Sequence, residues 1–120
     1  MRSFIASVFR IIFKISFLKK DYFGLYKRVF LPFNLFKGVT KDISYRNGIL
    51  LKLDLEDWIP QNIYFLNAYE EKEINFIEDF LKEGDCFIDV GANIGLFSLV
   101  ASKRVGSSGK VIAFEPFKRN

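Results

Sequence analysis

Histidine is absent from this sequence, and cysteine occurs once, as Cys86. Without histidine the chain has no His general base, no His metal ligand and no Ser-His-Asp triad, so chemistry that needs histidine must come from elsewhere. A single Cys excludes an internal disulfide, and no Cys or Cys/His spacing suggests zinc. We therefore expect no metal site and a reducing, cytoplasmic compartment.

Acidic residues are scarce at the N-terminal end. Residues 1–41 hold nine Lys and Arg against one acid, Asp21, whereas residues 42–120 hold nine Lys and Arg against thirteen acids. This asymmetry predicts an anionic surface as a partner of the first segment only, and nothing marks the second segment for nucleic acid. Half of all residues are apolar and 18% are aromatic, which is enough material for a hydrophobic core.

Residues 2–20 predict a basic amphipathic helix. Arg10 and Lys14 interrupt its apolar run, which is too short to span a bilayer, and no small-residue cleavage site follows. We expect neither a transmembrane span nor a signal peptide, and two roles remain open: docking of the apolar side on the rest of the protein, or peripheral contact with an anionic membrane. The apolar side comprises Phe4, Val8, Ile11, Ile12, Ile15 and Leu18, with Arg2, Ser3, Arg10 and Lys14 opposite.

The stretch after this helix is interpreted as a connector that completes a first segment, residues 1–41. Its glycines and its proline, Gly24, Pro32 and Gly38, keep any regular element short. A second segment, residues 42–69, opens with a hairpin signal.

In that hairpin the pair Asn47-Gly48 separates two apolar runs, and Ile49, Leu51, Leu53 and Leu55 alternate with more polar neighbours. Trp58 is interpreted as a core or loop anchor rather than a ligand contact. The apolar residues 63–66 suggest a further strand.

The third segment, residues 70–120, begins with a predicted helix from about Glu71 to Glu83, stopped by Gly84. Its acids are interpreted as favouring the helix dipole or facing water rather than as a carboxylate site. Its expected buried stripe is Ile74, Ile77, Phe80 and Leu81.

A strand, a glycine-containing turn, a helix and a second strand follow in order. Residues 86–90 form a compact apolar run that suits a strand buried on both faces, and residues 91–95 form the turn. A helix is expected over residues 96–105 and a second strand over 110–114, ending at Glu115. This order predicts the start of a doubly wound, Rossmann-like α/β sheet.

The turn residues suit a nucleoside ligand. Gly91 and Gly95 remove side chains that would block the ligand or strain the backbone, and Asn93 tolerates a left-handed conformation where a third glycine is expected. Glu115, at the end of the second strand, is placed to accept hydrogen bonds from a ribose diol. The pattern differs from the Gly-x-Gly-x-x-Gly fingerprint of dinucleotide sites, which disfavours a pyrophosphate ligand.

The strings FIDVGANIGLFSLVAS and VIAFEPFKRN, with the preceding YEEKEINFIEDFLKEGD, resemble the opening of the FkbM-type methyltransferases, a branch of the class I S-adenosylmethionine-dependent enzymes. The resemblance covers residues 69–120 and implies a seven-stranded, mostly parallel sheet with S-adenosyl-L-methionine over the strand ends. It implies that Asp89 and the turn (Gly91, Ala92, Asn93 and Gly95) hold the methionine end of the cofactor and that Glu115 holds its ribose.

The same resemblance implies methyl transfer to the hydroxyl of a small molecule, such as a sugar or natural product, or of a glycan. From the charge pattern we expect no nucleic-acid partner. The family's adenine-contacting, substrate-binding and catalytic positions come after residue 120, so we expect an N-terminal fragment that is inactive alone and has no assignable catalytic residue. The alternative is a noncatalytic relic of such an enzyme that binds a membrane surface or a partner protein.

Overall fold

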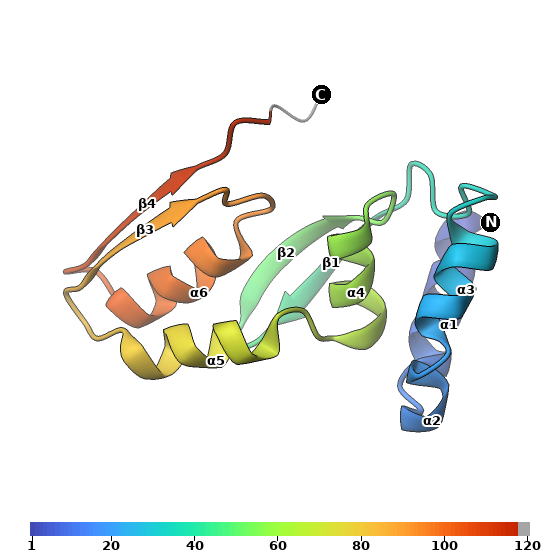
Figure 1. Ribbon diagram of the computed structural model, residues 1–120, viewed down its shortest axis with the longest axis horizontal. Helices are drawn as coiled ribbons and strands as arrows, with labels where there is room; N and C mark the ends of the chain where they lie inside the picture. The colour runs from blue at the N-terminus through green and yellow to red at the C-terminus, as the bar shows by residue number, and fades with distance from the viewer. Residues whose placement is uncertain (118–120) are drawn as a thin grey trace. The chain divides into compact units, whose positions relative to one another are not determined.

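The computed structural model of the protein describes residues 1–117 and separates into two compact units, Met1–Tyr69 and Glu70–Asn120 (Figure 1). Residues 118–120, which end the third segment and the family resemblance, lie outside the described residues. The fold is mixed α/β, with a two-stranded sheet in each unit. The first two expected segments, 1–41 and 42–69, fold together in the first unit.

The first unit opens with short helices: α1 (Arg2–Ile12), α2 (Ser16–Lys19), α3 (Tyr22–Leu25) and the π-helix η1 (Tyr26–Phe30). The single helix expected over residues 2–20 is therefore wrong beyond Ile12. The chain turns at Phe13, which is buried, and Ile15 is extended. This break lets Phe13 and Tyr22 enter one core, with ring centroids 5.3 Å apart.

The stretch interpreted as a connector contributes to that core. Tyr22, Phe30 and Phe36 are each 2% exposed, and the rings of Phe30 and Phe36 meet edge to face at 4.8 Å. Aromatic rings bury more area than any other side chain and pack in this geometry. The expectation of short elements is confirmed, and the stretch also supplies central core residues, which the sequence did not predict.

The hairpin is confirmed as β1 (Thr40–Tyr45) and β2 (Ile49–Asp54), paired antiparallel. Asn47 and Gly48 have φ of 49° and 76°, and Asn and Gly are the residue types that accept such positive values in hairpin turns. The alternation is also confirmed, since Ile49, Leu51 and Leu53 are all buried.

Residues 63–66 are not a strand, because they lie in helix α4 (Trp58–Leu66). Pro60 falls in the first turn, where its missing N–H costs no helical hydrogen bond. Ile63 and Phe65 are buried, and α4 contacts both β2 and α1. A short apolar run does not distinguish a strand from a helix with most of its surface covered, so the neighbouring elements decide the outcome.

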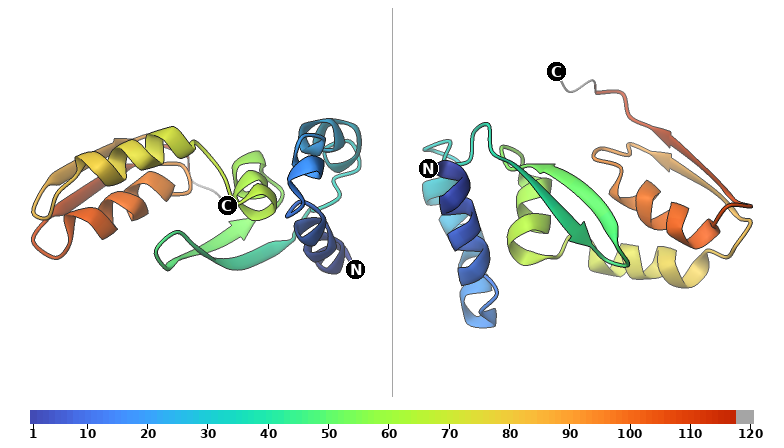
Figure 2. Two further views of the ribbon diagram at one scale, coloured as in Figure 1. Left: turned by 90° about the horizontal axis from the view of Figure 1, so that it is seen from below. Right: turned by 180° about the vertical axis from the view of Figure 1, so that it is seen from behind.

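The second unit contains α5 (Glu71–Phe80), β3 (Cys86–Val90), α6 (Leu96–Val105) and β4 (Lys110–Phe114). Strands β3 and β4 are parallel, with Cys86 opposite Lys110 and Val90 opposite Phe114. Helix α6 connects them and packs on one face of the pair, and α5 packs against α6 on that side (Figures 1 and 2). The expected order of strand, turn, helix and strand is confirmed.

Two expectations about burial in this unit are wrong. Helix α5 ends at Phe80 rather than Glu83, and Phe80 is 66% exposed, although Ile74 and Leu81 are buried as expected. Strand β3 is not covered on both faces: Val90 is 81% exposed, because α6 covers only the opposite face. Among residues 70–117, no element covers the second face of the pair.

Candidate functional site

The turn between β3 and α6 is attached to the end of β4. The main-chain N–H groups of Gly91 and Ala92 both donate to the carbonyl oxygen of Phe114, at 2.8 and 3.0 Å. Within the turn, the Gly95 N–H donates to the Ala92 oxygen at 2.7 Å. The parallel pairing of β3 and β4 thus continues into the turn and fixes its position.

The backbone of the turn is left-handed at three residues. Gly91, Asn93 and Gly95 have φ of 86°, 51° and 77°, so the expectation that Asn93 adopts this conformation is confirmed. A Cβ added at Gly91 or Gly95 would meet no atom within 4 Å. These glycines are therefore explained by their backbone conformation, and close packing within the protein does not explain them.

Glu115 follows β4 directly and reaches back to this turn. Its Oε2 accepts a hydrogen bond from the Asn93 N–H at 2.6 Å, and its Oε1 accepts one from the Phe117 N–H at 2.8 Å. The residue is exposed. An ionised carboxylate offers about four acceptor positions, so each oxygen retains capacity for a hydroxyl donor.

Asp89 lies in β3, just before the turn. It is 7% exposed, and its Oδ2 accepts a hydrogen bond from the Ser98 hydroxyl in α6 at 2.6 Å. This contact joins β3 to the first turn of α6 and so braces both ends of the glycine turn. Sequence reasoning did not identify Ser98; the available signal was a hydroxyl in the first helical turn, nine residues after the strand acid.

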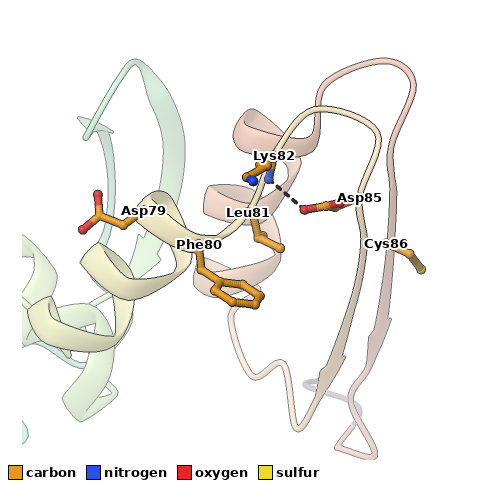
Figure 3. Close-up of a pocket in the computed structure, with 6 residues that line it drawn as sticks. All are labelled: Asp79, Phe80, Leu81, Lys82, Asp85 and Cys86. Carbon is orange, nitrogen blue, oxygen red and sulfur yellow. Dashed lines mark hydrogen bonds between the residues drawn. The ribbon is translucent and has the colours of Figure 1, made fainter.

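The structure therefore brings Glu115 together with residues 91–95, whereas the Asp89 carboxylate is directed toward α6. A separate open hollow of about 600 Å³ lies at the other end of β3, lined by residues 79–82, 85 and 86. Figure 3 shows Asp85 turned toward the main-chain nitrogen of Lys82, to which it is bonded at 2.8 Å. This hydrogen bond closes the loop between α5 and β3. It lies at the opposite end of β3 from the turn of residues 91–95 and so adds no group to that turn. Residues 1–117 contain no group of three or more Cys, Asp or Glu side chains that could hold a metal ion.

Comparison with known proteins gives one informative similarity. Over 70 residues the chain is 36% identical to a ribosomal RNA large subunit methyltransferase E from Oleidesulfovibrio alaskensis. The aligned region covers 58% of this chain and 31% of that protein, so the match spans about a third of the relative's length. No family model matches the chain. No solved structure matches it. The similarity supports a relationship to methyltransferases in general, and the FkbM-type assignment gains no support from it.

Proposed function

We propose that the second unit forms one part of an S-adenosyl-L-methionine site and that the protein acts in methyl transfer. The carrying observation is the 2.6 Å hydrogen bond between Asn93 and Glu115, which holds a carboxylate beside an open left-handed turn. A carboxylate after the second strand of such a unit is the group that binds a ribose diol. The similarity to a known methyltransferase gives independent support for the same chemistry.

In this proposal each residue has a distinct task. Glu115 accepts hydrogen bonds from the ribose hydroxyls, and Gly91, Ala92, Asn93 and Gly95 lie along the methionine end of the cofactor. Asp89 shares that end and, through Ser98, keeps the turn in position. When bound, the cofactor supplies an electrophilic methyl group for the acceptor. None of residues 1–117 is proposed as a catalytic residue.

For the acceptor we propose a hydroxyl of a small molecule or glycan, such as a sugar or natural product, in keeping with the FkbM-type resemblance. A second candidate is ribosomal RNA, because the similar protein is described as a ribosomal RNA large subunit methyltransferase. Transfer of a labelled methyl group from S-adenosyl-L-methionine into a small-molecule or glycan methyl ether, compared with its transfer into ribosomal RNA, distinguishes the two. We propose the cytoplasm as the compartment, in keeping with the free thiol of Cys86.

The cofactor assignment is tested by titrating the ¹⁵N-labelled chain with S-adenosylhomocysteine and following amide shifts by NMR. One face of the β3–β4 pair is open, so much of the burial that drives ligand affinity is missing. We therefore expect weak binding, about 1 mM or 4 kcal/mol, with shifts concentrated at residues 91–95. Glu115→Ala removes hydrogen bonds to a charged group worth about 1.5–3 kcal/mol and should abolish these shifts.

Glu73→Ala is the matched control, because Glu73 is an exposed acid on α5, and it should leave the shifts unchanged. NAD serves as the control ligand and should produce no shifts at the turn. The assignment fails if Glu115→Ala titrates like the unchanged chain, or if NAD and S-adenosylhomocysteine shift the same amides equally.

A further inference from the structure

Helix α1 is apolar on two sides, and only one of them packs on the first unit. Ala6 and Phe13 are 0% and 2% exposed, and Phe9 meets Phe30 with ring centroids 5.0 Å apart. These residues lie on the side of the helix where sequence reasoning placed Arg2 and Arg10. The helix therefore docks on the protein, but not through the apolar side identified from the sequence.

The side identified from the sequence is open to solvent. We call it the outer stripe: Phe4, Val8, Ile11 and Ile15, which are 73%, 38%, 66% and 57% exposed. The first three lie within α1 at spacings of four and three residues, which align them on one face of the helix, and Ile15 follows just after it. Large apolar side chains grouped on one exposed face indicate a surface that binds something.

Cations gather at the end of this stripe. A hollow of about 270 Å³ between the end of α1, α2 and α4 is lined by Arg10, Lys14 and Lys19, with Tyr64, Leu66 and Asn67 among the other lining residues. The Arg10 guanidinium lies 4.5 Å from the centroid of the Tyr64 ring, and Lys19 Nζ donates to the Leu66 oxygen at 3.4 Å. Within residues 1–117, no acid lines this hollow.

The placement of these cations suits a phosphate group. The cation–π contact holds Arg10 at the wall of the hollow, whose lining residues include no carboxylate among residues 1–117. Lys14 lies between Ile11 and Ile15 in the sequence, so one cation of the hollow is close along the chain to two residues of the apolar stripe. Apolar side chains beside a cluster of cations form the pattern of an interfacial helix.

We propose that the first unit binds the surface of an anionic membrane, with the outer stripe in the acyl boundary and a lipid phosphate in the hollow of Arg10, Lys14 and Lys19. The charge of residues 1–41, nine cations against one acid, complements such a surface. No helix among residues 1–117 is long and apolar enough to cross the bilayer. The proposed binding is peripheral, through the outer stripe and the hollow, and it does not depend on the proposed methyltransferase function.

The test is co-sedimentation of the 120-residue chain with vesicles of phosphatidylcholine alone or containing 30% phosphatidylglycerol. We expect binding to the anionic vesicles and much weaker binding to the neutral ones, with 0.5 M NaCl reducing the difference. The double change Lys14→Gln and Lys19→Gln should weaken anionic binding about 30-fold, since each cation near the surface is worth about 1 kcal/mol. Phe4→Ser with Ile11→Ser should weaken it about tenfold or more.

Two control variants separate this surface from exposure in general. Leu50→Ser removes an apolar side chain that is 81% exposed on β2, and Lys52→Gln removes an exposed cation on the same strand. Both should bind vesicles like the unchanged chain. Trp58 fluorescence checks that each variant remains folded, because its ring packs on Tyr26 at 4.4 Å between centroids.

Several results would overturn the proposal. Equal binding to neutral and anionic vesicles removes the role of the hollow, and full binding by the Phe4 and Ile11 variant removes the role of the stripe. NMR shifts at the hollow with millimolar inorganic phosphate, together with no vesicle binding, would identify a soluble phosphate as the ligand. A stripe-dependent dimer in sedimentation equilibrium would identify a second copy of the chain as the occupant.

Discussion

The main-chain N–H of Asn93 donates a 2.6 Å hydrogen bond to Oε2 of Glu115, across 22 residues of sequence. The contact joins the turn after β3 to the residue after β4, so the two halves of the proposed ligand site hold each other in place. Asn93 is also one of the three left-handed residues of the turn, so the carboxylate is bonded within that turn. The carboxylate is thus positioned before any ligand arrives, which reduces the entropy lost on binding.

Gly91→Val should abolish the response of residues 91–95 to S-adenosylhomocysteine while preserving the helical circular dichroism signal. Valine at a φ of 86° costs about 1–3 kcal/mol of local strain, yet its Cβ meets no protein atom within 4 Å. Gly38→Val is the matched control, because Gly38 has a φ of 69°, equally open surroundings and a place in the other unit. Global unfolding of Gly91→Val would favour a purely structural role, and retained ligand shifts would reject the ligand contact.

Ser98→Ala should destabilise the second unit by about 1–3 kcal/mol, because it leaves the buried Asp89 carboxylate without its hydroxyl donor. Urea unfolding followed by circular dichroism measures the change. Ser102→Ala, an exposed position on the same helix, is the control and should alter stability by much less. If the two variants unfold alike, the Asp89–Ser98 contact does not brace the turn.

Gly109→Ala should destabilise the second unit by about 1–3 kcal/mol through overpacking. A Cβ at this position would lie 2.4 Å from the Cβ of Val105 and 2.7 Å from its carbonyl oxygen, so the end of α6 or the start of β4 must shift. Amide exchange in β3 and β4 reports the loss, while Trp58 fluorescence should show an unchanged first unit. Unaltered exchange in β4 would mean that the loop yields without cost.

Above about pH 10 the first unit should lose stability because of Tyr22. Burial raises the pKa of the Tyr22 hydroxyl, so the folded state keeps it neutral while the unfolded chain ionises near pH 10. The unfolded state then releases a proton that the folded state retains, and the free energy of unfolding falls as the pH rises. In Tyr22→Phe, the decrease in the free energy of unfolding with rising pH should be smaller by the contribution of one proton. Urea unfolding at pH 9 and pH 11 measures this decrease. Identical slopes would show that Tyr22 ionises without unfolding.

At lower pH the same variant measures a different contact. The Tyr22 hydroxyl donates to Oε1 of the buried Gln61 at 3.4 Å, and Gln61 in turn donates to the Leu55 oxygen at 2.8 Å. The first of these bonds is long, so at pH 7 we expect Tyr22→Phe to cost no more than about 1 kcal/mol.

Positions whose role depends on backbone conformation were predictable from the sequence alone. Asn47-Gly48 determined the hairpin turn, and Gly91, Asn93 and Gly95 determined the left-handed turn after β3, because few residue types accept a positive φ. Period-two alternation determined which face of β2 is buried. These signals are local, so the rest of the fold does not alter them.

Only the tertiary structure decided which apolar surfaces are covered. Residues 63–66 are helical because α1 and β2 pack against α4. Helix α1 docks through Phe9 and Phe13 because the aromatic core accepts those rings. The outer stripe is therefore left in solvent. The bond between Asp89 and Ser98 likewise arises only when α6 folds back on β3. A sequence shows which side chains are apolar, but burial is a property of two surfaces, and the second surface is supplied by distant residues.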